Sequence, residues 1–590
     1  MKISKSMGNL EIAKLFRAVA AAYALKEEDN KFRITAYERA ADAVEHSSSE
    51  VKDLWDCGEL GSLAGVGSAM TQHLDELFRK GRVKHFDQLF RGLPAAVFEL
   101  MEIPGIGVKM AYKLCKALGI NRTHGAVEKL ERAAKRGKVR KVEGFGEESE
   151  RNVLENIIQM RKRTTRILLP DAYRTAREVI DWLGETGGIK TAEPLGSLRR
   201  KASTVGDIDI AVFCERPAGV IKRFTQFPQV SQIIESGTES ASIVVSRGIQ
   251  VDLMVQPERR FGSLLQHFTG SKHHNIALRE LALKRGVSLS EKGIKRGSTL
   301  KEFSTEEDFY GYLGMDWIPP ELREDAGEIE AGISHKLPVL VELSEIKGDL
   351  HLHSSFNSEP SHDLGTSSME DMIQKALTLK YQYVGFSEHN PSVSRHSESE
   401  IIDLVKTKRE IIEKVNYSFA NRGIFVFNGM EIDIKPDGSR ALPDKALELL
   451  DYAIVSIHGS FGGEKTSQTE RVIRAMSHEK VRIFGHPTAR KLREREGVDL
   501  EWEKIFEFCH KQKKILEINS YPDRLDLPDV LVKEAVKSGV KLVINTDSHE
   551  VSAMDLMTYG TSVARRGWAE GSDIMNALKL ADFKKELLNP

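Results

Sequence analysis

A length of 590 residues excludes a single hydrophobic core, because cores stop growing at about 250–300 residues, and a prior of about 150 residues per domain predicts roughly four domains. A hydrophobic content of 40% and a charged content of 29% exclude a disordered or fibrous chain. Because the sequence contains no run of about 18 uncharged apolar residues, we expect no membrane span and no membrane partner. Glu11 and Lys14 interrupt the apolar positions near the N-terminus, so we expect no secretory signal and a cytoplasmic location.

The formal net charge of −1 conceals local clusters of positive charge. Lysines and arginines crowd into residues 135–141 and again into residues 161–166. Each cluster alone is typical of a solvated helix face, so its meaning depends on the sequence around it. The four cysteines lie far apart and form no CxxC pair, which argues against a disulfide framework and against a cysteine-based zinc site.

The first 165 or so residues have the apolar spacing of helices and contain one short motif three times. Each copy is a hydrophobic-x-Gly-hydrophobic-Gly turn that precedes an amphipathic helix, and the copies are about 40 residues apart. Paired glycines permit a tight turn, after which the free N–H groups of the helix can face a phosphate. This helix-hairpin-helix pattern grips a nucleic-acid backbone without reading its sequence. The three glycine pairs are Gly65 and Gly67, Gly105 and Gly107, and Gly144 and Gly146.

A single copy of this motif would be an ordinary structural turn. Three copies beside two basic clusters predict a DNA-binding region, and with it a nucleoid-associated protein.

From about residue 167 to residue 320 the pattern is mixed, with strand-like runs at 208–213 and 243–255. Asp207 and Asp209 stand two positions apart, so on a strand they point to the same face, and Asp252 lies in the second run. Three carboxylates on neighbouring strands suit two Mg²⁺ or Mn²⁺ ions, which stabilise the attacking and leaving oxygens of an in-line phosphoryl displacement. A lone Asp-x-Asp would be a solvated turn, but this combination predicts a catalytic centre.

The segment just before these aspartates supplies groups for a triphosphate. Gly196 permits a close approach of the backbone, Ser197 offers a hydroxyl, and Arg200 offers a forked guanidinium. Gly206 directly precedes Asp207 and completes the predicted nucleotide-binding segment.

The runs GSLRR (196–200), GDIDI (206–210), VDLMV (251–255) and HFTGS (267–271) resemble family X DNA polymerases, which belong to the nucleotidyltransferase superfamily. The resemblance extends from the N-terminus to about residue 320. It implies that Asp207, Asp209 and Asp252 hold the catalytic metals and that Ser197 and Arg200 hold the incoming triphosphate. It also implies that Phe268, Thr269 and Gly270 face the sugar of the nucleotide. Asn275 would then touch the nucleobase, and Arg279 would lie near the template. His267 replaces the tyrosine of animal repair members, at a position that bears on the exclusion of ribonucleotides.

The N-terminal 85 residues resemble the small domain that binds a downstream 5′-phosphate in the repair members of this family. Lys31, Arg33, Tyr37 and Arg39 fit such a pocket. In members with lyase activity, a lysine in the helix after the first hairpin forms a Schiff base. Here that helix begins Ser68-Ala-Met-Thr-Gln-His73 and has no lysine at this point, so we predict phosphate binding without the conventional lyase reaction.

The segment from Ile318 to about Leu343 is rich in prolines and acidic residues and is predicted to be a linker. After it, six short apolar strands, starting near 383, 424, 453, 481, 514 and 541, alternate with helical stretches. This βα rhythm predicts a parallel sheet closed into a barrel, in which chemistry gathers at the carboxyl ends of the strands.

Metal-ligating side chains follow these predicted strands. His351 and His353 alternate on one strand, so both imidazoles face the same side. One buried histidine is more often a satisfied core residue than a ligand, but a series at successive strand ends predicts a metal cluster. The eight candidate ligands are His351, His353, His389, Glu431, His458, His486, Asp547 and His549.

This second pattern resembles the polymerase-and-histidinol-phosphatase (PHP) domain over residues 346–575. The resemblance implies up to three ions, Mn²⁺ or Zn²⁺, bridged by the glutamate that Glu431 matches, and hydrolysis of a phosphoester. The family's HxH run usually leads to Ser-Asp-Gly, whose aspartate is a ligand, whereas Ser358 stands here. Glu359 and Asp363 are the two candidate substitutes, and one weak metal position is the other alternative.

We therefore predict a multidomain α and α/β protein with a helical N-terminal region, a nucleotidyltransferase palm and thumb, and a C-terminal distorted (β/α) barrel. The predicted boundaries place the 5′-phosphate domain at 1–85, the hairpin fingers at 86–165, the palm at 166–258, the thumb at 259–322, a linker at 323–345 and the PHP domain at 346–590.

The predicted function is template-directed gap filling in base-excision repair, with a PHP domain that removes 3′-terminal nucleotides or blocking groups. The expected partners are gapped primer–template DNA with a 5′-phosphate and dNTPs, and we expect a monomer. Some relatives cleave at abasic sites, which the resemblance permits. Two rivals stay open at this point: a small-molecule phosphatase of the histidinol phosphatase type with an accessory N-terminal half, and a non-catalytic DNA-binding scaffold.

Overall fold

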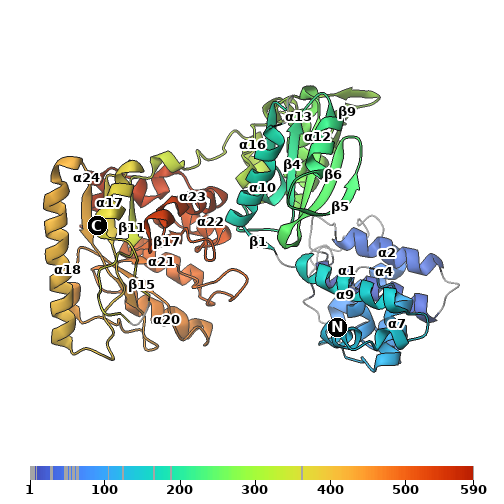
Figure 1. Cartoon of the computed structure of the whole chain (residues 1–590), viewed down its shortest axis with the longest axis horizontal. Helices are drawn as coiled ribbons and strands as arrows, with labels where there is room; N and C mark the ends of the chain where they lie inside the picture. Colours follow the sequence, from blue (N-terminus) through green and yellow to red (C-terminus); the bar gives the residue numbers. More distant parts are fainter. Residues whose placement is uncertain are drawn as a thin grey trace. The chain divides into compact units, whose positions relative to one another are not determined.

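The computed structural model describes the chain in two compact units, residues 1–165 with 246–249 and residues 166–245 with 250–590 (Figure 1). The structure describes every residue except 1–6, 8, 27–30, 46–50, 52–54, 56–59, 61–65, 102, 104, 123, 124, 164, 165, 186–188, 361, 362, 589 and 590. Among the described residues, no helix is both long enough and apolar enough to cross a membrane.

Helices dominate the described part of the first unit, as the apolar spacing predicts. They pack around two separate cores, one within residues 7–89 and one within residues 96–157. In the first core, the ring of Phe16 meets the rings of Tyr37 and Phe86 edge-on, at centroid distances of 5.6 and 6.4 Å. The helices are α1 (Asn9–Lys26), α2 (Lys31–Glu45), α4 (Ser68–Lys80), α5 (Lys84–Phe90), α6 (Ala96–Leu100), α7 (Val108–Leu118), α8 (Ala126–Lys135) and α9 (Glu147–Arg163).

The three glycine turns each precede a helix, in agreement with the sequence pattern. Gly67 caps α4, Gly107 caps α7, and Gly146 stands directly before α9. Gly105 and Gly144 have φ angles of +77° and +86°, which only glycine adopts without strain. Gly65 lies outside the described residues. The described turns therefore leave the first N–H groups of α4, α7 and α9 without intrahelical partners, as a phosphate contact requires.

The second unit begins with a five-stranded mixed sheet, in the order β2-β4-β7-β6-β5. Strand β4 occupies the predicted run 208–213, and β4 and β7 pair in parallel. The predicted strand 243–255 is two strands, because the turn η3 (Ser246–Gly248) divides it and reverses the chain. The strands are β2 (Thr191–Pro194), β4 (Ile208–Phe213), β5 (Val230–Ser236), β6 (Ser240–Val245) and β7 (Ile249–Gln256), and the helices of this region are α10 (Leu169–Gly184), α11 (Gly196–Arg199) and α12 (Pro217–Thr225).

A smaller subdomain follows the mixed sheet. It contains α13 (Glu258–Thr269), α14 (Lys272–Lys284), a three-stranded antiparallel sheet and α15 (Glu306–Tyr312). The buried side chains of α14, the small sheet and α15 form their own core, which includes Leu278, Ile294 and Phe309. Phe261 and Leu264 of α13 pack instead with Ala211 and Phe213 of the mixed sheet. The three strands are β8 (Ser288–Ser290), β9 (Gly293–Arg296) and β10 (Thr299–Lys301).

The segment 323–345, predicted as a linker, is instead packed against this subdomain. It contains α16 (Glu328–Ile333), and the side chains of Arg323 and Glu328 are fully buried. Arg323 donates to Glu306 at 2.6 Å and to the carbonyl of Ile318 at 2.8 Å. Acidic and basic residues suggest an exposed segment in a sequence, but here Arg323 is buried against Glu306, and Glu328 is buried against the His274 ring and two backbone N–H groups.

The C-terminal region is a closed, distorted parallel barrel, as predicted. Its strands form sheets of three and five members, in which every pairing is parallel. Parallel bridges between His389 and Glu431 and between Leu352 and Ser548 join the two sheets and close the barrel. The strands are β11 (Gly348–Leu352), β12 (Tyr383–Phe386), β13 (Phe425–Asn428), β14 (Glu431–Asp433), β15 (Ala453–Ser456), β16 (Val481–Phe484), β17 (Ile515–Asn519) and β18 (Leu542–Asn545).

Helices cover the outside of this barrel (Figure 1). Almost every residue of the eight strands is buried, as in parallel sheets that are covered on both faces. The main helices are α17 (Met369–Thr378), α18 (Glu398–Phe419), α20 (Lys465–Met476), α21 (Trp502–Gln512), α22 (Asp529–Lys537), α23 (Met557–Arg566) and α24 (Leu580–Leu588).

The packed segment 323–345 makes a stability prediction. Replacement Arg323→Ala leaves Glu306 buried with one fewer cationic partner, and we expect a loss of about 3 kcal/mol in the free energy of unfolding. Urea denaturation followed by tryptophan fluorescence measures this loss. Lys336→Ala, at an exposed position of the same segment, is the control and leaves the curve unchanged. Equal curves for the two variants would mean that the segment is an open linker after all.

Candidate active sites

The first candidate site lies on the two parallel strands of the mixed sheet. The register of β4 and β7 places Asp209 directly opposite Asp252, and Asp207 stands exposed just before β4. Burial, together with the charges of Asp207 and Asp252, raises the pKa of Asp209 to about 7. Gln250 donates to both carboxylate oxygens of Asp252, at 3.1 and 3.0 Å. This concentration of negative charge suits divalent cations.

The segment Gly196–Arg200 lies against these carboxylates. Gly196 has a φ of +56°, and a Cβ atom there would stand 2.6 Å from Oδ2 of Asp209, so only glycine fits. Ser197 is the second residue of the short helix α11, and Gly206 directly precedes Asp207. The guanidinium of Arg200 donates from Nε to Glu324 at 2.9 Å and from Nη1 to the carbonyl of Thr269. The structure thus brings the predicted triphosphate segment to the predicted catalytic aspartates.

The predicted sugar and base residues lie at the junction of α13 and α14. Arg199 donates to the Thr269 hydroxyl at 2.7 Å, and a Cβ atom on Gly270 would stand 3.1 Å from Nη1 of Arg200. Asn275 donates to the carbonyl of His267 at 2.7 Å. The ring of Phe268 meets the His267 ring at 4.9 Å, and Arg279 is exposed on α14. These residues therefore gather beside Arg200, with Arg279 one turn beyond Asn275.

A pocket of about 380 Å³ lies in the first unit, at the place predicted to bind a 5′-phosphate. Of the four predicted residues, Arg33 and Tyr37 line it, whereas Lys31 and Arg39 are exposed elsewhere on α2. The Tyr37 hydroxyl bonds to Nδ1 of His73 at 2.9 Å. The helix expected after the first hairpin is α4, whose one lysine is its last residue, Lys80.

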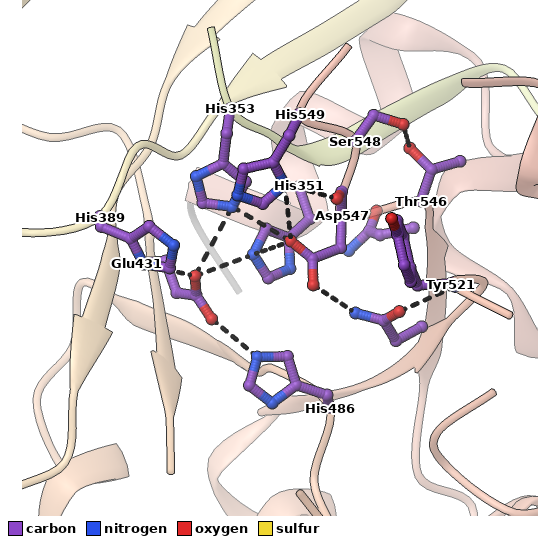
Figure 2. Close-up of polar contacts among 12 residues, drawn as sticks. His351, His353, His389, Glu431, His486, Tyr521, Thr546, Asp547, Ser548 and His549 are labelled. Carbon is purple, nitrogen blue, oxygen red and sulfur yellow. Dashed lines mark hydrogen bonds and ion pairs between the residues drawn. The ribbon is translucent and has the colours of Figure 1, made fainter. Parts of the chain in front are cut away.

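The second candidate site gathers side chains at the carboxyl ends of the barrel strands, and Glu431 is at its centre (Figure 2). Its Oε2 lies 3.3 Å from Nε2 of His351, 3.6 Å from Nε2 of His353 and 3.0 Å from Nδ1 of His389. Its Oε1 lies 2.9 Å from Nε2 of His486 and 3.4 Å from Nε2 of His458. One carboxylate therefore contacts five imidazoles, and each of its oxygens faces a different group.

Asp547 and His549 complete this cluster from the end of β18. Asp547 Oδ1 lies 3.2 Å from Nε2 of His353, and the rings of His353 and His549 stack with centroids 4.3 Å apart. The backbones of Asp547 and His486 have φ angles of +54° and +27°, which are uncommon for residues other than glycine and recur at functional sites.

The donor atoms of this cluster fit metal ions. Three groups have all their ligand atoms within 4.8 Å of one another, and each of His353, His389 and Glu431 belongs to two of these groups. Nε2 of His351, Nε2 of His353 and Oε2 of Glu431 are buried but make no hydrogen bond of normal geometry. Imidazole nitrogens and carboxylate oxygens together suit Mn²⁺ or Zn²⁺. The groups are His353, His389 and His549; His351, His353, Glu431 and Asp547; and His389, Glu431 and His458.

Supporting residues that the sequence analysis did not identify hold these ligands. Glu517 accepts from Nδ1 of His351 at 2.7 Å, and Asp433 lies 2.7 Å from Nδ1 of His458. Each contact directs the other ring nitrogen toward Glu431. Both carboxylates sit on strands, and Asp433 stands two residues after Glu431, which was the signal available in the sequence. Arg524 also reaches the site, with Nε 3.8 Å from Asp547.

Ser358 occupies the position of the aspartate ligand that the PHP resemblance implies. Of the two candidate substitutes, Glu359 and Asp363, one lies at the site. The Ser358 hydroxyl donates to the carbonyl of His389 at 2.8 Å, and Glu359 pairs with His396 at 3.0 Å. The carboxylate of Asp363, in contrast, lies 3.6 Å from Nε2 of His389 and 3.6 Å from Nε2 of His549. Of the two candidates, Asp363 is therefore the one that faces imidazoles of the candidate metal cluster.

Comparisons with protein families agree with this architecture. A helix-hairpin-helix domain matches residues 7–83, and a SAM-like helix-hairpin-helix tandem matches residues 97–157. The DNA polymerase beta thumb matches residues 264–324, and the PHP domain matches residues 349–521. Asp547 and His549 lie beyond residue 521, where this last match ends, but both contact His353 in the folded chain. The architecture is that of a nucleotidyltransferase joined to a PHP domain.

Individual proteins show the same combination. The chain is 33% identical to the DNA polymerase/3′-5′ exonuclease PolX of Bacillus subtilis (strain 168) over 98% of its own length and 99% of that protein. It is 23% identical to DNA polymerase lambda of Rattus norvegicus over 54% of its length and 56% of that protein. It is also 26% identical to a probable phosphatase of Caldicellulosiruptor saccharolyticus over 31% of its length and 74% of that protein.

The chain therefore belongs to the family X DNA polymerases that carry a C-terminal PHP domain, as the sequence predicts. It is an enzyme, and membership of this family implies DNA and dNTPs as substrates and a dependence on divalent metal ions.

The contact between Glu517 and His351 predicts a change in metal affinity. Replacement Glu517→Gln removes the buried negative charge that orients His351 and increases its basicity, so we expect Mn²⁺ to bind about tenfold more weakly. Isothermal titration calorimetry measures this affinity. Glu507→Gln, which changes an exposed side chain of α21, is the matched control. An unchanged affinity in Glu517→Gln would show that His351 is not a ligand or that it needs no such support.

Proposed function

We propose that this enzyme fills short gaps in DNA during base-excision repair and that its barrel removes nucleotides or blocking groups from 3′ ends. The observation that carries this proposal is the presence, in one chain, of two separate sets of converging side chains, one of aspartates and one of imidazoles with carboxylates. One set faces the segment Gly196–Arg200, and the other surrounds Glu431.

In the polymerase half, each group of residues has a distinct task. Asp207, Asp209 and Asp252 hold Mg²⁺ or Mn²⁺, and these ions, when bound, supply the positive charge that stabilises phosphoryl transfer. The Ser197 hydroxyl and the Arg200 guanidinium hold the triphosphate, while Gly196 and Gly206 let the backbone approach it. Phe268, Thr269 and Gly270 face the sugar, Asn275 the nucleobase and Arg279 the template. The primer 3′-hydroxyl attacks the α-phosphate at this site, the bond between the α- and β-phosphates breaks, and pyrophosphate leaves.

In the barrel, Glu431 and the seven surrounding His and Asp ligands hold up to three Mn²⁺ or Zn²⁺ ions, which, when bound, supply an activated water for phosphoester hydrolysis. Asp363 closes the group formed by His389 and His549. The half-buried guanidinium of Arg524 stands beside Asp547, where it neutralises charge on the phosphoester. Cleavage at abasic sites is a second reaction that this site can support.

The helical unit binds the DNA backbone. The turns at Gly65–Gly67, Gly105–Gly107 and Gly144–Gly146 hold the backbone, and the pocket of Arg33 and Tyr37 receives the downstream 5′-phosphate, with Lys31 and Arg39 adding charge nearby. Phosphate binding proceeds there without the lyase reaction.

The enzyme works as a monomer, in the cytoplasm and on the nucleoid. The working division of the chain keeps domain boundaries near residues 85, 165, 258 and 322.

A test of two separate sites needs one gel. A 5′-labelled primer on DNA with a one-nucleotide gap and a downstream 5′-phosphate is incubated with Mn²⁺, with and without dNTPs. Asp207→Ala loses extension by at least about a hundredfold and keeps shortening, because only the first site loses a metal ligand. His351→Ala shows the reverse. Loss of both activities in either variant would contradict separate sites.

The same preparations distinguish the remaining rival for the barrel. The similarity to a probable phosphatase favours a second candidate, hydrolysis of a small phosphomonoester. Release of phosphate from such a substrate without DNA, at a rate that exceeds the shortening of a primer, would support it over 3′-end processing.

The position of Asp363 predicts a difference between two neighbouring carboxylates. Asp363→Ala removes a carboxylate from the group of His389 and His549, so we expect one fewer Mn²⁺ ion per chain and slower primer shortening by about tenfold. Metal content is measured by mass spectrometry after gel filtration. Glu359→Ala, whose carboxylate pairs with His396 instead, keeps the wild-type metal content. The opposite result would make Glu359 the ligand.

A further inference from the structure

Two consecutive arginines at the end of helix α23 reach from the barrel to the polymerase half of the second unit. Arg565 pairs with Glu321 at 3.0 Å and also bonds to Glu342 and to the carbonyl of Val341. Arg566 points to a different place and contacts the segment that contains Arg200. Both side chains are largely buried, with exposed fractions of 18% and 9%.

Arg566 contacts three residues that fix its guanidinium, and its Nε donates to Oδ2 of Asp529 at 2.7 Å. Nη1 donates to the backbone carbonyl of Arg200 at 2.7 Å and lies 2.9 Å from Oε1 of Glu324. Nη2 lies 2.6 Å from Oδ2 of Asp529, on the neighbouring helix α22. Asp529 thus anchors Arg566 within the barrel, and the other two contacts extend into the polymerase half.

Glu324 links Arg566 to the side chain of Arg200. Its Oε1 accepts from Nε of Arg200 at 2.9 Å, so one carboxylate oxygen serves both guanidiniums. Nη1 of Arg200 is held in addition by the carbonyl of Thr269. Arg566 therefore restrains Arg200 twice, once at its backbone and once through the carboxylate that orients its side chain.

We propose that Arg566 of the barrel is a positioning residue for the polymerase reaction, because it holds Arg200 in the orientation that receives the triphosphate of the incoming nucleotide. The inference rests on the proposed role of Arg200. An arginine side chain has many rotamers, and fixing it before the ligand arrives reduces the entropy lost on binding. Without Arg566, the Arg200 carbonyl loses a buried hydrogen bond. Glu324 loses its ion pair with Arg566 and keeps the one with Arg200. Both changes weaken the binding of the triphosphate and leave the catalytic aspartates untouched.

The experiment measures single-nucleotide insertion into gapped DNA by the full chain while the dNTP concentration is varied. In Arg566→Ala we expect the KM for dNTP to rise about tenfold, the effect of losing one charge-assisted hydrogen bond, with kcat changed less than twofold. Arg566→Lys restores part of the loss, because an ammonium keeps the charge but not the fork. Primer shortening without dNTPs stays at the wild-type rate and reports that the barrel is folded.

Arg565→Ala is the matched control, since it removes the neighbouring arginine and its contacts with Glu321 and Glu342 but touches neither Arg200 nor Glu324. Its KM for dNTP stays within twofold of wild type. An equal rise of KM in both variants would overturn the proposal, since it would show a general loosening of the two halves. An unchanged KM in Arg566→Ala would overturn it as well.

A double-mutant cycle tests the route through Glu324. Glu324→Gln also raises the KM for dNTP, and the double variant Glu324→Gln/Arg566→Ala shows less than the product of the two single effects, because both act on Arg200. Fully multiplicative effects would overturn the coupling. If the wild-type enzyme inserts no nucleotide at all, the proposed polymerase function fails and this inference with it. Normal insertion by both wild type and Arg566→Ala overturns this inference alone.

Discussion

The burial of carboxylates on neighbouring strands is the constraint on which both active sites depend. In the mixed sheet, parallel pairing sets Asp209 directly opposite Asp252, and Asp207 adds a third negative charge. In the barrel, the buried carboxylates of Glu431 and Asp547 face one shell of imidazoles. Neighbouring carboxylates raise the pKa of Asp209, whereas the imidazoles hold the pKa of Glu431 and Asp547 well below the usual range. Buried carboxylates need positive partners in a medium of low dielectric, and divalent cations supply them at both sites. The metal requirement of the enzyme thus follows from where the strands place acidic residues.

Parallel strands explain why such sets form at all. The two adjacent strands of the mixed sheet that carry the aspartates are its parallel pair, and every pairing of the barrel is parallel. Parallel neighbours bring corresponding ends to the same edge, so residues far apart in the chain, such as His353 and Asp547, come together there. The loops that follow the strands can then vary. The replacement of the usual aspartate by Ser358, with Asp363 five residues further along, is a variation of this kind.

The sequence allowed much of this arrangement to be predicted. Six of the eight barrel strands were predicted to within about one residue, because strands buried on both faces are short, continuous apolar runs, whereas the three-residue strand β14 was not predicted. The linker prediction at 323–345 was wrong, because charges such as Arg323 and Glu328 are buried by partners from distant elements, and this pairing leaves no local signal. The supporting roles of Glu517 and Arg566 were not predicted for the same reason, since their contacts join residues that are 166 and 366 positions apart. Residue types and spacing predict ligands on adjacent strands, whereas supporting contacts require the folded chain.

The central claim is that one chain holds two independent metal centres. The most direct test is a crystal structure of the enzyme with Mn²⁺, with anomalous scattering to locate the ions. The account predicts anomalous peaks at two separate places, one between Asp207, Asp209 and Asp252 and the other around Glu431, within about 2.5 Å of the carboxylate oxygens. Ions at the barrel alone would leave the polymerase aspartates without a catalytic role. Ions at the aspartates alone would contradict a working hydrolase in the barrel.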